Sequence, residues 1–117
     1  MDRDTFSQIV DEAIDTLPQW AVDSIDNLRI LIEERPTDQQ HAGPDDLLGL
    51  YDGIPLQERG PDYVAELPDT IFIFREPHLA LNLSPDELRV EIQRTVLHEL
   101  AHYFGIDDER LEQLGWD

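Results

Sequence analysis

The fold of this chain is decided by residues 84–105, which read SPDELRVEIQRTVLHELAHYFG. The stretch opens with Ser84, followed by Pro at the first helical position and by Glu87 three residues after the Ser, which is a capping box. It closes at Gly105, which favours the left-handed end of a helix. Apolar residues recur between these ends at four-residue intervals: Leu88, Ile92, Val96, Leu100 and Phe104. The pattern predicts one helix of about 30 Å, enough to cross a small domain.

The same helix carries His98-Glu99-Leu100-Ala101-His102, a His-Glu-x-x-His pattern. Two His residues four apart lie one above the other on a helix face, so both rings can reach one metal ion. Glu99 lies one step round the helix, where its carboxylate can accept a proton from a metal-activated water. A random chain of this composition would contain the pattern only about 0.01 times, which argues against an accidental pair of surface histidines. We predict that His98 and His102 bind Zn²⁺ and that Glu99 is the catalytic general base.

A zinc site with an open position needs a third protein ligand. Asp108 lies six residues after His102 and beyond Gly105, where the chain can fold back over the metal. Asp108 could instead cap a last helix, expected at about 108–114. Other carboxylates nearby could also be the ligand: Asp107 and, as weaker candidates, Glu109 and Glu112. Because a metal here requires a third ligand, we favour Asp108.

Residues 98–108 resemble the His-Glu-x-x-His-x-x-Gly-x-x-Asp signature of the minimal zincin-like metallopeptidases, a family of short bacterial proteins. The resemblance continues through residues 109–111 and 114–116 and, upstream, through residues 50–56. It implies an α+β zincin-like fold, with a small mixed sheet, a long active-site helix and N- and C-terminal helices. It also implies peptidase activity and a carboxylate ligand at Asp108. The metzincins differ, because their third ligand is His and they carry a methionine turn, whereas the only Met here is Met1.

Upstream of the long helix, the pattern predicts a helix and three strands. Apolar residues from Phe6 to Leu17 follow helical spacing, with Asp4 or Thr5 as the cap and Pro18 as the end. Strands are expected at residues 28–32, 47–51 and 71–74. The last of these is uniformly apolar, which is typical of a strand covered on both faces. The alternative is a strand at the edge of the sheet, where it could pair with an extended peptide.

Four further side chains could help to stabilise an oxyanion or to orient a substrate: His41, Tyr63, His78 and Tyr103. For Tyr103 the alternative is a packing role with its hydroxyl at the surface. His41 lies in an acidic loop and is expected to be exposed. His78 follows Pro77 just after a strand, which suggests a position at the rim of the site.

The composition excludes several classes of function. The length of 117 residues suits one domain, residues 1–117, and the chain has no Cys for disulfides or thiolate metal sites. The net charge of −19 repels phosphate backbones, so we expect no nucleic-acid partner. There is no membrane-length apolar run and no secretory signal at the start, so we expect a cytoplasmic monomer that does not bind membranes.

The leading functional hypothesis is a zinc-dependent peptidase that acts on a peptide or protein substrate. Its rival is a non-catalytic metal- or partner-binding module on the same fold, whose zinc would be held by four protein ligands. The acidic charge alone leaves a third possibility, an acidic partner for a basic protein.

Overall fold

The computed structural model describes residues 1–40, 47–61, 68–106 and 108–114, with the side chains of Gln57, Asp108, Leu111 and Leu114 left out. His41, Tyr63 and Asp107 therefore lie outside the described residues. The elements are α1 (Arg3–Asp15), α2 (Gln19–Ser24), β1 (Leu28–Glu33), β2 (Gly49–Asp52), the 3₁₀ helix η1 (Leu56–Glu58), β3 (Asp69–Phe74), α3 (Arg75–Leu79), α4 (Pro85–Phe104) and α5 (Asp108–Leu114).

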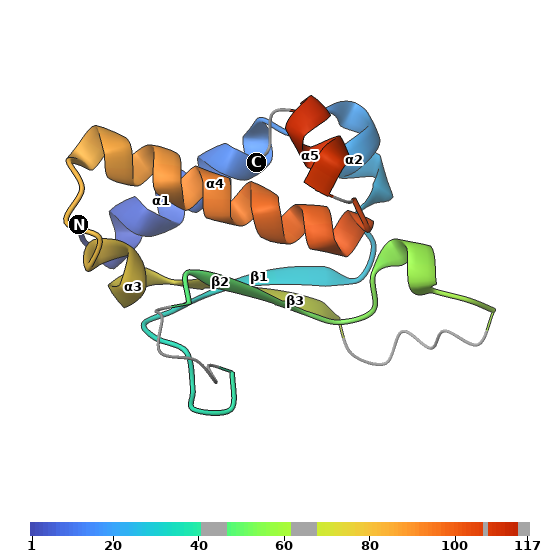
Figure 1. Cartoon of the computed structure of the whole chain (residues 1–117), viewed down its shortest axis with the longest axis horizontal. Coiled ribbons are helices and arrows are strands. Elements are labelled where there is room, and N and C mark those ends of the chain that lie inside the picture. The colour runs from blue at the N-terminus through green and yellow to red at the C-terminus, as the bar shows by residue number, and fades with distance from the viewer. Residues whose placement is uncertain (41–46, 62–67, 107, 115–117) are drawn as a thin grey trace.

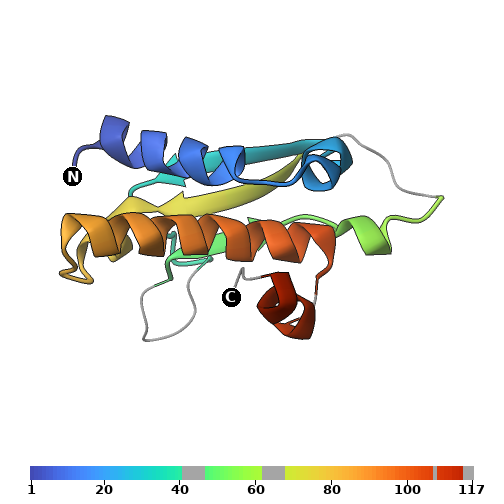
Figure 2. The same ribbon diagram turned by 90° about the horizontal axis from the view of Figure 1, so that it is seen from above.

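The described strands form a mixed sheet in the order β1-β3-β2. β1 runs parallel to β3, and β2 runs antiparallel to it. Figure 1 shows α1 and α4 on the same face of this sheet, and Figure 2 shows them side by side over it. Helices packed on one face of a small mixed sheet make an α+β fold, as the sequence predicted. No helix of the described residues has the length and apolar character needed to cross a bilayer.

The long helix α4 is confirmed at both ends. The Ser84 hydroxyl accepts a hydrogen bond from the backbone N–H of Glu87 at 3.2 Å, and Pro85 is the first helical residue. Gly105 ends the helix with a φ of 71°, a left-handed conformation that is strained for other residues. The predicted apolar stripe is buried against α1 and the sheet: Leu88, Ile92, Val96, Leu100 and Phe104.

The first helix is present, but its predicted cap was wrong. Asp2, rather than Asp4 or Thr5, is the N-cap, and its carboxylate accepts a hydrogen bond from the Thr5 N–H at 2.8 Å. The helix also ends earlier than predicted, at Asp15, because Pro18 starts the separate helix α2. Phe6, Ile9, Val10 and Ala13 form its buried face.

The strand predicted at residues 71–74 is longer and lies at the centre of the sheet, so the sheet-edge alternative was wrong. It extends from Asp69 to Phe74 and pairs with β1 on one side and β2 on the other. Ile71 and Ile73 are fully buried in the core. A central strand has no free hydrogen-bonding edge, so it cannot pair with a peptide.

A buried polar network joins the sheet to the segment around η1. Asp69 accepts hydrogen bonds from Arg59 Nη2 at 2.7 Å and from the Tyr51 hydroxyl at 2.6 Å. The Arg59 guanidinium also donates to the Asp26 carbonyl at 3.1 Å and lies 5.3 Å from the centroid of the Tyr103 ring. The side chains of Arg59 and Asp69 are only 8% and 6% exposed, so this ion pair is isolated from solvent.

Candidate metal centre

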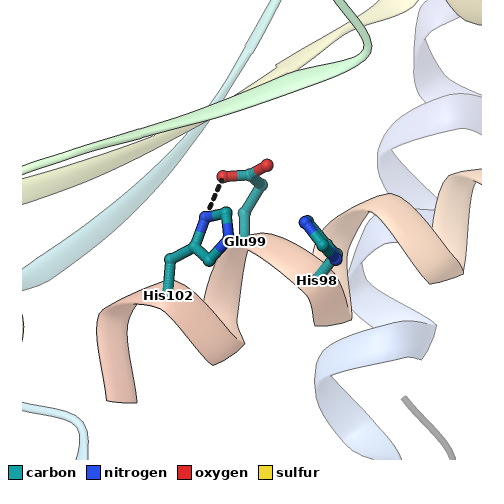
Figure 3. Close-up of side chains that lie close together, drawn as sticks. All are labelled: His98, Glu99 and His102. Atoms are coloured by element: carbon teal, nitrogen blue, oxygen red, sulfur yellow. Dashed lines mark ion pairs between the residues drawn. The ribbon is translucent and has the colours of Figure 1, made fainter. Parts of the chain in front are cut away.

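Three side chains that can ligate a metal come together on one side of α4. Figure 3 shows Glu99 between the rings of His98 and His102. One nitrogen of each ring and one carboxylate oxygen of Glu99 lie within 4.8 Å of one another. The ring centroids are 4.6 Å apart, and Nδ1 of His102 lies 3.3 Å from Oε2 of Glu99. The four-residue spacing of the two histidines on a continuous helix produces this arrangement.

The three side chains differ in their exposure. Glu99 is buried, with only 8% of its surface exposed, whereas His98 is half-buried and His102 is exposed. His98 and Glu99 line a cleft of about 320 Å³ between α4 and the start of β2, together with Leu47, Leu48, Gly49, Glu91, Arg94 and Thr95. The cluster is therefore open to solvent on the histidine side, and its carboxylate lies at the inner wall of a cleft.

Gly49 on β2 allows the sheet to approach Glu99 closely. A Cβ at this position would lie 2.7 Å from Cγ2 of Thr95 and 3.1 Å from Cγ of Glu99. The first of these distances is too short for two carbon atoms that are not bonded. Any larger residue at position 49 therefore forces either β2 or the Thr95 side chain to move.

Gly49→Ala is expected to lower the free energy of unfolding by about 1–3 kcal/mol, since inserting a methyl group into a packed contact costs about that much. Urea denaturation measures the change. The matched control is Gly60→Ala, because a Cβ at Gly60 has no atom within 4 Å. Thr95→Ser removes the methyl group that clashes and keeps the hydroxyl. The double variant Gly49→Ala/Thr95→Ser should therefore recover part of the loss, and a loss unchanged by Thr95→Ser would contradict this explanation.

The residues present fit a zinc ion. Two imidazole nitrogens suit Zn²⁺ and related transition metals, whereas Mg²⁺ and Ca²⁺ prefer all-oxygen sites, and the Glu99 carboxylate lies close enough to contact a water on the ion. Among the described residues, this group has the donor types and the proximity that a shared ion requires. Two ring ligands leave coordination positions for a further protein ligand and for water.

The predicted third ligand, Asp108, is the first residue of α5, which begins after the turn at Gly105. Figure 2 shows α5 beside the C-terminal part of α4, on the flank opposite to α1. The chain therefore does return towards α4 after the turn. The side chain of Asp108 lies outside the described residues, so its role as a ligand stays a prediction. Glu109 and Glu112 are exposed.

Of the predicted supporting residues, His78 does not lie at the rim of the site. It is fully buried in α3, where Nδ1 lies 2.6 Å from the Phe74 carbonyl and Nε2 lies 2.9 Å from the Thr95 hydroxyl. Since a carbonyl only accepts, Nδ1 carries the proton, and Nε2 faces the Thr95 hydroxyl, which also donates to the Glu91 carbonyl at 3.0 Å. The prediction of a rim position was wrong. His78 instead fixes Thr95, which lines the cleft one turn before Glu99.

Tyr103 packs in the core, as one interpretation of the sequence held, but its hydroxyl is not at the surface. The residue is fully buried. Its hydroxyl donates to the Asp26 carbonyl at 2.5 Å and accepts from the Asp26 N–H at 2.8 Å. Because its hydroxyl both donates and accepts a hydrogen bond, Tyr103 connects α4 to the loop before β1.

The stability of the protein should fall as the pH drops below about 6.5, in part because of His78. Burial lowers the pKa of His78 below its ordinary value of about 6.5. On acidification the unfolded chain therefore binds this proton before the native protein does, so the stabilisation present above pH 6.5 is lost as the pH falls towards the lowered pKa. His78→Asn should reduce the slope of unfolding free energy against pH between 5 and 6.5, by at most about 1.4 kcal/mol per pH unit for one proton. An unchanged slope would show that His78 does not contribute.

Gly49 and Thr95 were not predicted to shape the site. Their importance depends on how β2 pairs with β3 and on which face of α4 meets the sheet, and neither local composition nor spacing shows this. Gly49 lies inside the strand predicted at residues 47–51, and a Gly in a strand was the only available signal of a close backbone approach.

Comparison with known proteins agrees with this geometry. The sequence matches the family of zincin-like metallopeptidases over residues 25–116, a range that includes the three described strands and the whole of α4. A search of curated proteins found no match. The match extends over most of the chain. The fold of the chain places two histidines and a glutamate together on a long helix. The chain therefore belongs to the zincin-like metallopeptidase family.

Proposed function

We propose that this chain hydrolyses peptide bonds, using a zinc ion held by His98, His102 and Asp108. The observation that carries the proposal is the position of the Glu99 carboxylate, between two imidazole rings and at the wall of a solvent-open cleft. When bound, zinc supplies a Lewis acid that lets water lose a proton near neutral pH and that polarises a carbonyl group. Membership of the family supports the same class of reaction.

In this mechanism the protein positions the substrate and moves the proton. A carboxylate oxygen of Glu99 accepts the proton of the attacking water and later passes it to the leaving amine. The backbone of Gly49 confines the Glu99 side chain from the sheet side, because β2 passes close to it. The apolar side chains of Leu47 and Leu48 offer a substrate side chain an apolar surface in the cleft. Because the cleft is open, we expect an extended peptide to enter without unfolding of the domain.

The zinc site is tested by metal uptake with a readout that does not depend on activity. Isothermal titration of the metal-free protein with Zn²⁺ should give one ion per chain, and His98→Ala and His102→Ala should each weaken binding by more than about 100-fold, because ligand loss exceeds the 10–100-fold typical of outer-shell changes. Asp108→Ala should do the same, with Asp107→Ala as the matched control. If Asp107→Ala has the larger effect, Asp108 is not the ligand.

Removal of the metal distinguishes a catalytic from a structural zinc. Chelation should abolish cleavage of a mixed peptide library and leave the circular dichroism spectrum and the unfolding transition nearly unchanged, because the core of α1, α4 and the sheet forms without metal contacts. Cooperative unfolding on chelation would overturn the proposal in favour of a structural zinc site.

A further inference from the structure

The free edge of β1 lies on the opposite side of the domain from the metal cluster. In the part of the chain that the structure describes, β1 pairs with β3 and no strand lies on its other side. Figure 2 shows α1 running along β1, at the side of the domain away from α5. An unpaired strand edge presents backbone donors and acceptors to which another strand can bind.

The backbone groups at this edge can be assigned residue by residue. Asp69 N–H donates to the Asn27 carbonyl at 2.8 Å, which turns Asn27 towards β3. In a parallel pair, alternate residues face the same neighbour, so the backbone groups of Leu28, Ile30 and Ile32 face outwards. A separate observation confirms the outward direction of Ile32, because its carbonyl accepts a hydrogen bond from the Arg3 side chain and not from β3. The open part of the edge therefore extends from Leu28 to the N–H of Ile32, and Arg3 closes its far end.

Beside this edge lies a groove of about 640 Å³ between α1 and β1. Its walls include apolar side chains, of which Val10 is buried and the others are partly exposed: Val10, Ile14, Ile25, Leu28, Ile30, Leu31 and Ile32. An added strand would present one row of side chains to this groove, because side chains alternate between the faces of a strand. Apolar residues at alternate positions would fill it.

The charge around the groove selects the partner. Asp4, Asp11 and Glu33 line it with exposed carboxylates, and the chain as a whole carries −19. Arg3 also lines the groove and pairs with Glu34 at 2.8 Å, so three carboxylates at the groove face one cationic side chain. A second copy of this acidic chain would bring like charges together, whereas a basic segment would be attracted.

We propose that the free edge of β1 and the adjoining groove bind an extended segment of a partner protein in which basic and apolar residues alternate. The segment adds a fourth strand to the sheet: its backbone pairs with Leu28, Ile30 and Ile32, and its apolar side chains enter the groove. Its basic side chains lie on the opposite face of the strand, near Glu33, and are attracted by the net negative charge around this edge, to which Asp4 and Asp11 contribute. This site is separate from the metal cluster, and its function does not depend on peptidase activity.

The probe is a labelled seven-residue peptide of alternating lysine and valine, titrated into the full-length metal-free chain and followed by fluorescence anisotropy. Two N-methylated versions of the peptide test the backbone pairing. Each carries N-methyl groups at alternate residues, so that the backbone N–H groups along one edge of the extended peptide cannot donate hydrogen bonds. Methylation of the edge that faces β1 should weaken binding more than about 10-fold, and methylation of the other edge should change it less than about twofold. Equal effects of the two versions would overturn the proposal, because attraction by net charge does not distinguish the two edges.

Two charge variants locate the site. Asp11→Arg, at the groove, should weaken binding of the unmethylated peptide by roughly fivefold, whereas Asp23→Arg, an equal charge change at an exposed position on α2, should have little effect. Equal losses would overturn the proposal. The proposal would also be overturned if the chain dimerised with increasing concentration and the peptide did not dissociate the dimer. The edge would then be occupied by a second copy of the chain. Failure of the zinc experiments would leave all of these outcomes unchanged.

Discussion

Replacing Glu99 by Gln is expected to lower kcat/KM for peptide hydrolysis by about 10²–10⁴-fold, the usual contribution of a positioned general base. Gln has nearly the same shape as Glu and should still fit beside Gly49 and Thr95, so the fold should be kept. It cannot accept the proton of the attacking water. Since the rings of His98 and His102 are unchanged, the variant should still bind zinc.

The measurement combines single-turnover cleavage of a peptide found in a library screen with zinc titration of the same preparation. Glu87→Gln is the matched control, because Glu87 lies on the same helix but is exposed in its first turn. The control should keep full activity. If Glu99→Gln retains activity within a few-fold of the unchanged protein, Glu99 is not the base and the proposed mechanism fails.

Truncating Asp69 is expected to have the largest effect on stability. Its carboxylate binds Arg59 and Tyr51 in a site where both partners of the ion pair are almost fully buried. Asp69→Ala removes the buried carboxylate that pairs with Arg59 and leaves only the exposed Asp26 carboxylate near its charge, and breaking a buried ion pair typically costs about 3–5 kcal/mol. A small domain has only about 5–15 kcal/mol of stability in total, so the variant should be partly unfolded at 37 °C.

Asp26→Ala is the matched control for this experiment. The Asp26 carboxylate also lies near Arg59, at 3.8 Å, but it is 80% exposed. An exposed ion pair contributes about 0–1 kcal/mol, so the control should be nearly as stable as the unchanged protein. Urea denaturation of both variants gives the comparison. Equal stabilities of the two variants would show that burial of the Arg59–Asp69 pair does not matter.

The parts of the fold that could be predicted are those encoded by local signals. The helix α4 carries its own cap, apolar stripe and stop within 22 consecutive residues, and the metal motif depends only on helical spacing. The predicted strands are present because β-prone residues cluster there, although β2 is shifted to Gly49–Asp52. The candidate metal group could be predicted from the side-chain types on one helix face, and the identity of the ion as Zn²⁺ stays a prediction.

The rest depended on contacts between distant residues. His78 looked like a rim residue because its partner Thr95 lies 17 positions later in the chain. The short helices α2 and α3 have five or six residues each, too few for a periodic pattern, and are held by packing. The Arg59–Asp69 pair and the close approach of Gly49 to Glu99 depend on strand register, and an isolated strand does not reveal its partners.

The position of β3 has a consequence for how the molecule assembles during synthesis. The middle strand of the sheet is made after both of its neighbours, so β1 and β2 have nothing to pair with until residue 74 has left the ribosome. Contacts that span this much chain form slowly, because a long loop must close first. The helix that carries His98 and His102 follows β3, so the candidate metal site is completed only after all three described strands have been made.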